Sequence, residues 1–263
     1  MRSMLSLVPP MVVLSALCLV AAPAHALATA SATISSLRME LIDLDPNDGV
    51  APGITFGRST WYPDVSHMAV ESAGARDSRS APVGTAMAAT IEMTQTFSSA
   101  AITAGDFFGT GPSPTATVLA TTEGTLPCCT TALAVIFHGR FLVTPHTRVV
   151  VTATGSVDVS ATVAGEGGYS TVFVELSQTA TSYRSFAFMS HLLHLNRPPE
   201  VSGNSPMVVS FTNVRNHVVE GDAIFRTSAQ AIPIPEPGTY ALMLAGLGIV
   251  GFVARRQASA LRT

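Results

Sequence analysis

Between two apolar termini, the chain alternates polar and apolar residues with a period of two. Residues 149–163 are the clearest case, because β-branched side chains interleave with polar ones around Gly155. This pattern predicts two strands or one bent strand. Residues 165–168, Gly-Glu-Gly-Gly, then form the clearest turn signal. The same alternation predicts further strands at 88–97, 115–122, 133–138, 171–177 and 207–214.

The predicted strands are separated by clusters of glycine, proline, serine and aspartate, and long helical periodicity is confined to the two termini. Many short strands with turn signals between them are typical of all-β proteins. We therefore expect an antiparallel β-sandwich, Ig-like or jelly-roll-like, that forms one exported domain over residues 27–230. Residues 186–193 fit either another strand pair or a short helix, and both alternatives stay open.

The N-terminus has the three parts of a secretory signal peptide. Arg2 supplies the positive charge, residues 11–22 form an apolar core, and Ala24-His25-Ala26 places small residues at the positions that signal peptidase recognises next to its cleavage site. Cleavage is expected after Ala26. The chain is therefore predicted to be exported, with signal peptidase as its first partner.

The C-terminus has a second ordered set of parts. Pro235 and Pro237 disfavour a regular helix, so this segment is expected to be extended and accessible. The apolar run 240–254 would rise about 22 Å as a helix, and we expect it to be a transmembrane helix. Arg255 and Arg256 then stop the span and hold residues 258–263 in the cytoplasm.

Residues 234–257 resemble the C-terminal sorting signal of the PEP-CTERM proteins of Gram-negative bacteria. The resemblance implies that residues 231–257 are a sorting signal, in which an exosortase recognises Pro235, Glu236 and Pro237, with Gly238 directly after them. It also implies an inner-membrane-anchored precursor, and then a place at the cell surface or in the extracellular matrix, with exopolysaccharide and biofilm. An ordinary single-pass anchor that is never processed is the alternative reading of the same residues.

Composition narrows the range of partners. The chain has no lysine, and between residues 27 and 235 ten arginines face sixteen aspartates and glutamates. Nucleic-acid binding needs positive charge gathered on one face, so we expect no nucleic-acid partner. Trp61 is the only tryptophan, which weakens a prediction of specific sugar binding, because sugar faces usually stack on aromatic rings.

One loop gathers oxygen donors. Asp43, Asp45, Asn47 and Asp48 place four oxygen-bearing side chains in six residues, a density that calcium favours. The spacing does not fit an EF-hand, and a strand that ends at Ile42 with an Asx turn after it explains the same residues. We therefore expect no metal or other cofactor, and keep these four residues as weak calcium candidates.

Two further sets of residues are candidates for chemistry. His191 and His194 would share one face of a helix, but no third metal ligand lies near them in the sequence. Cys128 and Cys129 remain after removal of the leader, and they could form a vicinal disulfide, stay as two thiols in a turn, or pair between molecules.

Two functions agree with these observations. The first is a non-catalytic, exported surface or matrix protein with a structural or adhesive role. The alternative is an envelope enzyme such as a hydrolase that acts on polysaccharide. Such an enzyme would need two carboxylates on either side of a cleft, and Asp158, Glu166 and Glu175 are the candidates.

Overall fold

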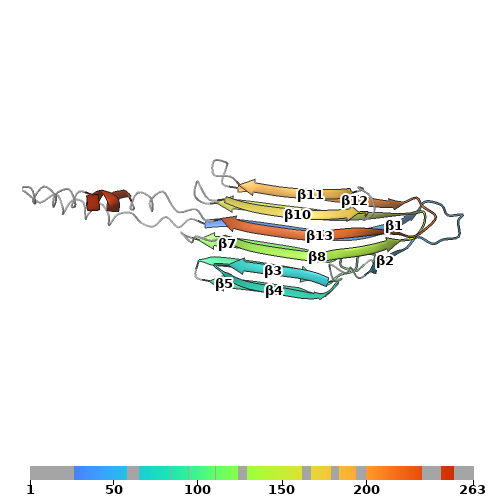
Figure 1. Cartoon of the computed structure of the whole chain (residues 1–263), viewed down its shortest axis with the longest axis horizontal. Helices are drawn as coiled ribbons and strands as arrows, with labels where there is room; N and C mark the ends of the chain where they lie inside the picture. The colour runs from blue at the N-terminus through green and yellow to red at the C-terminus, as the bar shows by residue number, and fades with distance from the viewer. Residues whose placement is uncertain are drawn as a thin grey trace, which may run out of the picture. The chain divides into compact units, whose positions relative to one another are not determined.

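Two antiparallel sheets form the protein's sandwich in a computed structural model (Figure 1). The structure describes residues 27–57, 65–83, 85–93, 95–109, 111–123, 129–161, 167–178, 184–193, 200–232 and 244–251. All strands lie in one compact unit, Ala26–Ile234, and the helix 244–251 belongs to a second unit. The predicted all-β antiparallel sandwich is confirmed.

Thirteen strands are present in the described residues. They are β1 (Leu27–Asp43), β2 (Ile54–Gly57), β3 (Val65–Ser72), β4 (Ala75–Pro82), β5 (Met87–Met93), β6 (Thr96–Thr103), β7 (Thr115–Glu123), β8 (Thr130–Val143), β9 (Thr147–Ala161), β10 (Gly167–Ser177), β11 (Arg184–Leu193), β12 (Glu200–Asn213) and β13 (Val219–Ile232). The six-stranded sheet has the order β12-β9-β1-β7-β6-β5, and the seven-stranded sheet has the order β11-β10-β13-β8-β3-β4, with β2 also paired to β8.

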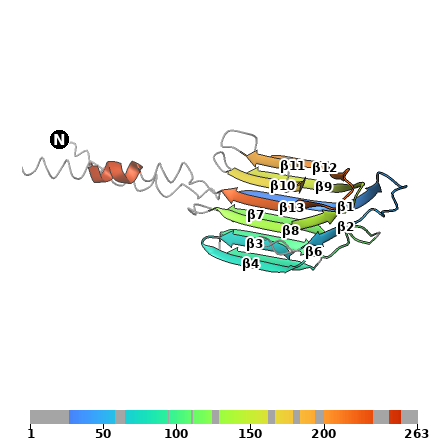
Figure 2. The ribbon, with the colours of Figure 1, turned by 45° about the vertical axis from the view of Figure 1, so that its right-hand side comes forward.

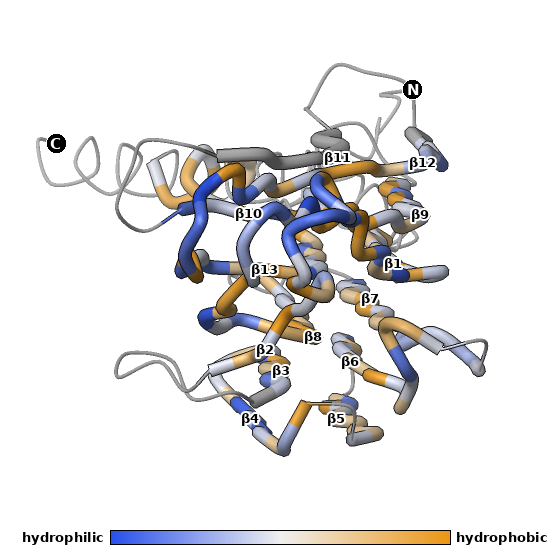
Figure 3. Tube along the Cα trace, turned by 90° about the vertical axis from the view of Figure 1, so that its right-hand side faces the viewer, coloured by the Kyte–Doolittle hydropathy of each residue, from blue (hydrophilic) through white to orange (hydrophobic). Residues whose placement is uncertain are grey.

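The two sheets lie face to face, as the turned view in Figure 2 and the view along the strands in Figure 3 show. We call the two ends of this sandwich proximal and distal. The proximal end holds the residues at which the described sandwich begins and stops, Leu27 and Ile232, which pair with Glu123 and Gly167. The distal end holds Asp43, Val143, Thr147, Asn213 and Val219.

Period-two burial in β1 explains how this sequence makes an inner face. Ala28, Ala30, Ala32 and Ile34 are at most 2 % exposed, and the residues between them are polar. A β-bulge between Ser35 and Arg38 then changes the phase, so that Leu37 and Met39 become the buried positions. The extra residue of a bulge moves the following side chains to the opposite faces, which keeps the apolar set of β1 in the core.

The side chains of the core become smaller from the distal to the proximal end of the sandwich. Ring contacts join five buried phenylalanines, Phe107, Phe137, Phe141, Phe211 and Phe225, with the partly buried Phe56, and the exposed Phe108 lies against Phe56. Toward the proximal end, alanines and small hydroxyl residues replace them, as in the paired positions Ala132, Ala229 and Ser170. Because a phenylalanine removes far more apolar area from water than an alanine, the aromatic part supplies more hydrophobic stabilisation per residue.

Several predicted strands differ from the observed ones in extent. Within the predicted segment 149–163, the described residues 149–161 all belong to one strand, β9, and Gly155 lies within its ladder, so the two-strand alternative is wrong. The single strand predicted at 88–97 is two strands, since β5 stops at Met93 and β6 starts at Thr96. Residues 184–193 form β11, which settles the choice between strand and helix.

Candidate functional site

Two loops of the distal end, β1–β2 and β8–β9, are joined by main-chain and threonine hydrogen bonds. Leu44 N–H donates to His146 O over 2.7 Å, which ties the loop after β1 to the turn between β8 and β9. Thr144 N–H donates to Gly53 O over 3.0 Å, and Gly53 N–H donates to Thr144 Oγ1 over 2.8 Å. These bonds fix the backbone on both sides of the aspartate-rich loop.

Asn213 joins the third loop to the same turn. Its side chain is 1 % exposed, and its Nδ2 lies 3.1 Å from Val143 O, 2.9 Å from Thr144 O and 2.9 Å from His217 O. Its Oδ1 accepts the N–H of Arg215 over 3.0 Å. One buried amide therefore satisfies backbone groups of both the β8–β9 turn and the β12–β13 loop.

The aspartates of the first loop each form an Asx turn. Oδ1 of Asp43, Asp45 and Asp48 accepts the backbone N–H two residues later, over 3.0, 3.2 and 2.7 Å. Gly49 follows with a φ of 72°, a left-handed conformation that glycine adopts without strain. The Asx turn predicted after the first strand is present, and it leaves Oδ2 of each carboxylate outside these bonds.

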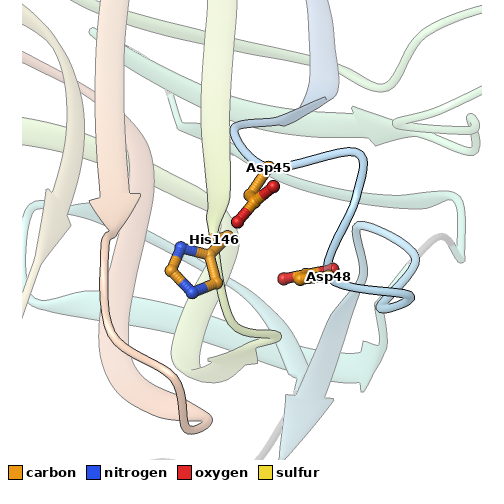
Figure 4. A group of neighbouring side chains, drawn as sticks. All are labelled: Asp45, Asp48 and His146. Carbon is orange, nitrogen blue, oxygen red and sulfur yellow. The ribbon is translucent and has the colours of Figure 1, made fainter.

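Asp45, Asp48 and His146 come together beside this loop (Figure 4). Each offers one possible ligand atom, and the three atoms lie within 4.8 Å of one another. Nε2 of His146 lies 2.8 Å from Oδ1 of Asn216 in the β12–β13 loop. The sequence singled out both aspartates, but it missed His146, which is about a hundred residues away along the chain.

The other calcium candidates have different places. Asp43 is the last residue of β1, pairs with Thr147, and is not part of the three-residue group. Asn47 is exposed in the loop and donates its N–H to Asp45. The observed group therefore contains an imidazole in addition to carboxylates, which changes the metal chemistry that it could support.

A second group of ionisable residues lies on the outer face of the seven-stranded sheet. Arg140 Nη1 lies 2.7 Å from Glu220 Oε1, and Arg140 Nε lies 4.0 Å from Asp222 Oδ1. Beside them, burial lowers the pKa of His138, with Asp222 and Glu175 opposing this shift and Arg226 adding to it. Arg226 also lies 4.9 Å from the ring centre of Phe173.

The lowered pKa of His138 predicts a loss of stability in acid. The folded protein binds a proton at His138 less readily than the unfolded chain does. The contribution of the neutral ring to stability is therefore fully present well above pH 6.5, and it falls as the pH drops from 6.5 to the pKa of the folded state. Between about pH 7.5 and about pH 5, the wild type should lose more unfolding free energy than His138→Gln in urea titrations. The exposed His217→Gln is the control, and equal losses for wild type and His138→Gln would contradict the prediction.

The carboxylates proposed for a hydrolase are not a pair. Asp158 lies between the buried Val157 and Val159 of β9, on the outer face of the six-stranded sheet. Glu175 lies on the outer face of the opposite sheet, in β10. The body of the sandwich separates them, so these two cannot act on one glycosidic bond. Glu166 lies outside the described residues.

The structure describes one residue of each remaining candidate pair, the two histidines and the two cysteines. His191 lies in the strand β11, so it is not on a helix face of the kind that it could have shared with His194, and His194 lies outside the described residues. Cys129 is exposed, and it forms no disulfide within the part of the chain that the structure describes. Cys128 lies outside that part, so the pairing of the two cysteines stays a prediction.

The C-terminal segment is described over one short helix, 244–251, in which Leu244, Leu247, Ile249 and Val250 are exposed. Among the described residues, no helix has both the length and the apolar character needed to span a bilayer. The transmembrane helix predicted over 240–254 is therefore not supported by the structure. Pro235, Glu236, Pro237 and Gly238, and the basic pair Arg255 and Arg256, lie outside the described residues.

Comparison with known proteins gives one match. Residues 233–257 match the PEP-CTERM protein-sorting motif, within one residue of the segment whose resemblance we noted in the sequence. No curated protein and no solved structure matches the chain. The motif is the signal that an exosortase recognises in its exported substrates. The chain is therefore an exported, exosortase-sorted protein that carries a PEP-CTERM motif behind an all-β sandwich.

Proposed function

We propose that this protein is a non-catalytic component of the cell surface or extracellular matrix, where its sandwich has a structural or adhesive role in an exopolysaccharide layer. The observation that carries the proposal is the junction between domain and signal. Strand β13 ends at Ile232, and the sorting motif begins at the next residue. Processing at the motif would therefore release or attach the sandwich directly through its last strand.

The position of that strand supports a structural role. β13 lies inside the seven-stranded sheet, between β10 and β8, and pairs with them over Asp222–Ile232 and Val219–Ala231. Tension applied at its C-terminal end along the strand would load these two ladders in shear, so many backbone hydrogen bonds would resist together. An edge strand would instead have a ladder on one side only. The fold thus suits a domain attached through its C-terminus.

The sorting step has a direct test. Intact mass and the C-terminal peptide are measured for protein recovered from the native envelope and from the medium. We expect the wild type to lose the residues beyond Pro235-Glu236-Pro237, and a variant with alanine at all three positions to keep them and stay in the membrane fraction. Alanine at Pro198 and Pro199, a proline pair outside the motif, should leave processing unchanged. An intact tail on wild-type protein would contradict the proposal.

The matrix role has a separate test. Sorted protein is mixed with purified native exopolysaccharide and sedimented, and the polymer is then sized by gel filtration. Sedimentation with the polymer at unchanged polymer length supports a structural or adhesive role. A shortened polymer would favour the hydrolase alternative, and protein that stays in the supernatant would argue against contact with this polymer.

A further inference from the structure

We propose that Asp45, Asp48 and His146 form a binding site for a divalent transition-metal ion of the zinc class at the distal end of the sandwich. The three possible ligand atoms lie within 4.8 Å of one another. Ligand atoms around a tetrahedral zinc ion with bonds of about 2.0–2.2 Å lie about 3.3 Å apart. Rotation about side-chain bonds can make up this difference, since the backbone positions are already close.

The donor set decides the metal class. Calcium takes six to eight oxygen ligands, whereas an imidazole with carboxylates suits zinc and its neighbours among the transition metals. Three protein ligands also leave a fourth tetrahedral position for water or for a donor from outside the protein. Asp48 is exposed, so an ion held here would be accessible from solvent.

The partner of His146 is an independent observation that points to a ligand. Oδ1 of Asn216 lies 2.8 Å from Nε2, so in the tautomer that carries its proton on Nε2 the ring donates to this amide oxygen. The neutral ring then keeps its lone pair on Nδ1. Metal-binding histidines typically donate their other N–H to a carbonyl or carboxylate in this way, which fixes the tautomer.

The site does not depend on the ion for its scaffold. Leu44 N–H bonds His146 O, and Thr144 bonds Gly53 in both directions, so the two ligand-bearing segments are already joined. The Asx turns of Asp45 and Asp48 hold their carboxylates through Oδ1. Only side-chain rotations, and no movement of the joined backbone segments, are needed on binding, which favours affinity.

The test is zinc titration of the full chain, purified without a histidine tag, by calorimetry and by the shift in melting temperature. Asp45→Asn and Asp48→Asn keep an Asx turn but lose the charge, and His146→Asn suits the φ of 49° at that position. We expect one zinc ion per chain in the wild type and affinity lowered at least tenfold in each variant. Asn216→Ala should lower it by about tenfold, because it removes the partner of the ring.

The matched control is Asp106→Asn. Asp106 also forms an Asx turn, to Phe108 N–H over 2.9 Å, but it belongs to the β6–β7 loop and not to the three-residue group. This variant should bind zinc as the wild type does. Absence of zinc binding to the wild type, or binding that survives all three ligand changes, as at exposed Cys129, would overturn the proposal. Binding of calcium in preference to zinc, unaffected by His146→Asn, would also overturn it.

Discussion

Asn213→Ala is expected to lower the free energy of unfolding by about 3 kcal/mol, at about 1 kcal/mol for each of its two side-chain N–H donors and for the Oδ1 that accepts the N–H of Arg215. Asn213 is buried, and its Nδ2 reaches the carbonyl oxygens of Val143, Thr144 and His217. Alanine can replace none of these bonds. The loss should appear as a lower urea midpoint at an unchanged slope.

Two further variants separate hydrogen bonding from packing. Asn213→Asp has nearly the same shape and can still accept the N–H of Arg215, but it brings a carboxylate against three carbonyl oxygens. It should destabilise at least as much as alanine, whereas a packing role would make it mild. Asn204→Ala, at an exposed position of the same strand, should change stability by less than about 0.5 kcal/mol. A mild effect of Asn213→Asp would contradict the assignment.

The fold class could be predicted from the sequence because branched and polar residues alternate clearly in β7, β9 and β10. Two strands lack a clear alternation of apolar and polar residues in the sequence, for different physical reasons. In β1, the alternating residues Ala28, Ala30 and Ala32 differ little from their polar neighbours in hydropathy, and alanine is uncommon in strands. In β4, an edge strand, most side chains are exposed, so no buried face imposes an alternation.

The segment between β5 and β6 contains none of the residue types that usually mark a turn, which explains why a single strand was predicted over 88–97. The residues from Met93 to Thr96 include no glycine, proline, asparagine or aspartate, so the period-two pattern runs through the reversal without a break.

The candidate metal group shows a similar limit. Its aspartates share one loop and could be found locally, but His146 joins them only because β1 pairs with β9 and places residue 43 opposite residue 147.

Gly221→Ala is expected to destabilise the sandwich by about 3 kcal/mol, at the upper end of what overpacking costs. Gly221 lies opposite Phe141 in the ladder between β13 and β8. A Cβ at this position would lie 2.5 Å from Cζ of Phe141 and 2.7 Å from the backbone oxygen of Ser177. The ring has little room to move, because Phe211 of the other sheet packs edge-on against it at 5.1 Å between centres.

Gly57→Ala is the matched control, since Gly57 also pairs with a residue of β8 but a Cβ added there would meet nothing within 4 Å. This variant should change stability by less than about 0.5 kcal/mol. The double variant Gly221→Ala, Phe141→Leu separates the two contacts of the new methyl group. If the ring is the main obstacle, the double variant should be less destabilised than the sum of the two single changes. Strict additivity would instead assign the cost to the backbone of β10 at Ser177, because that oxygen cannot move without the strand.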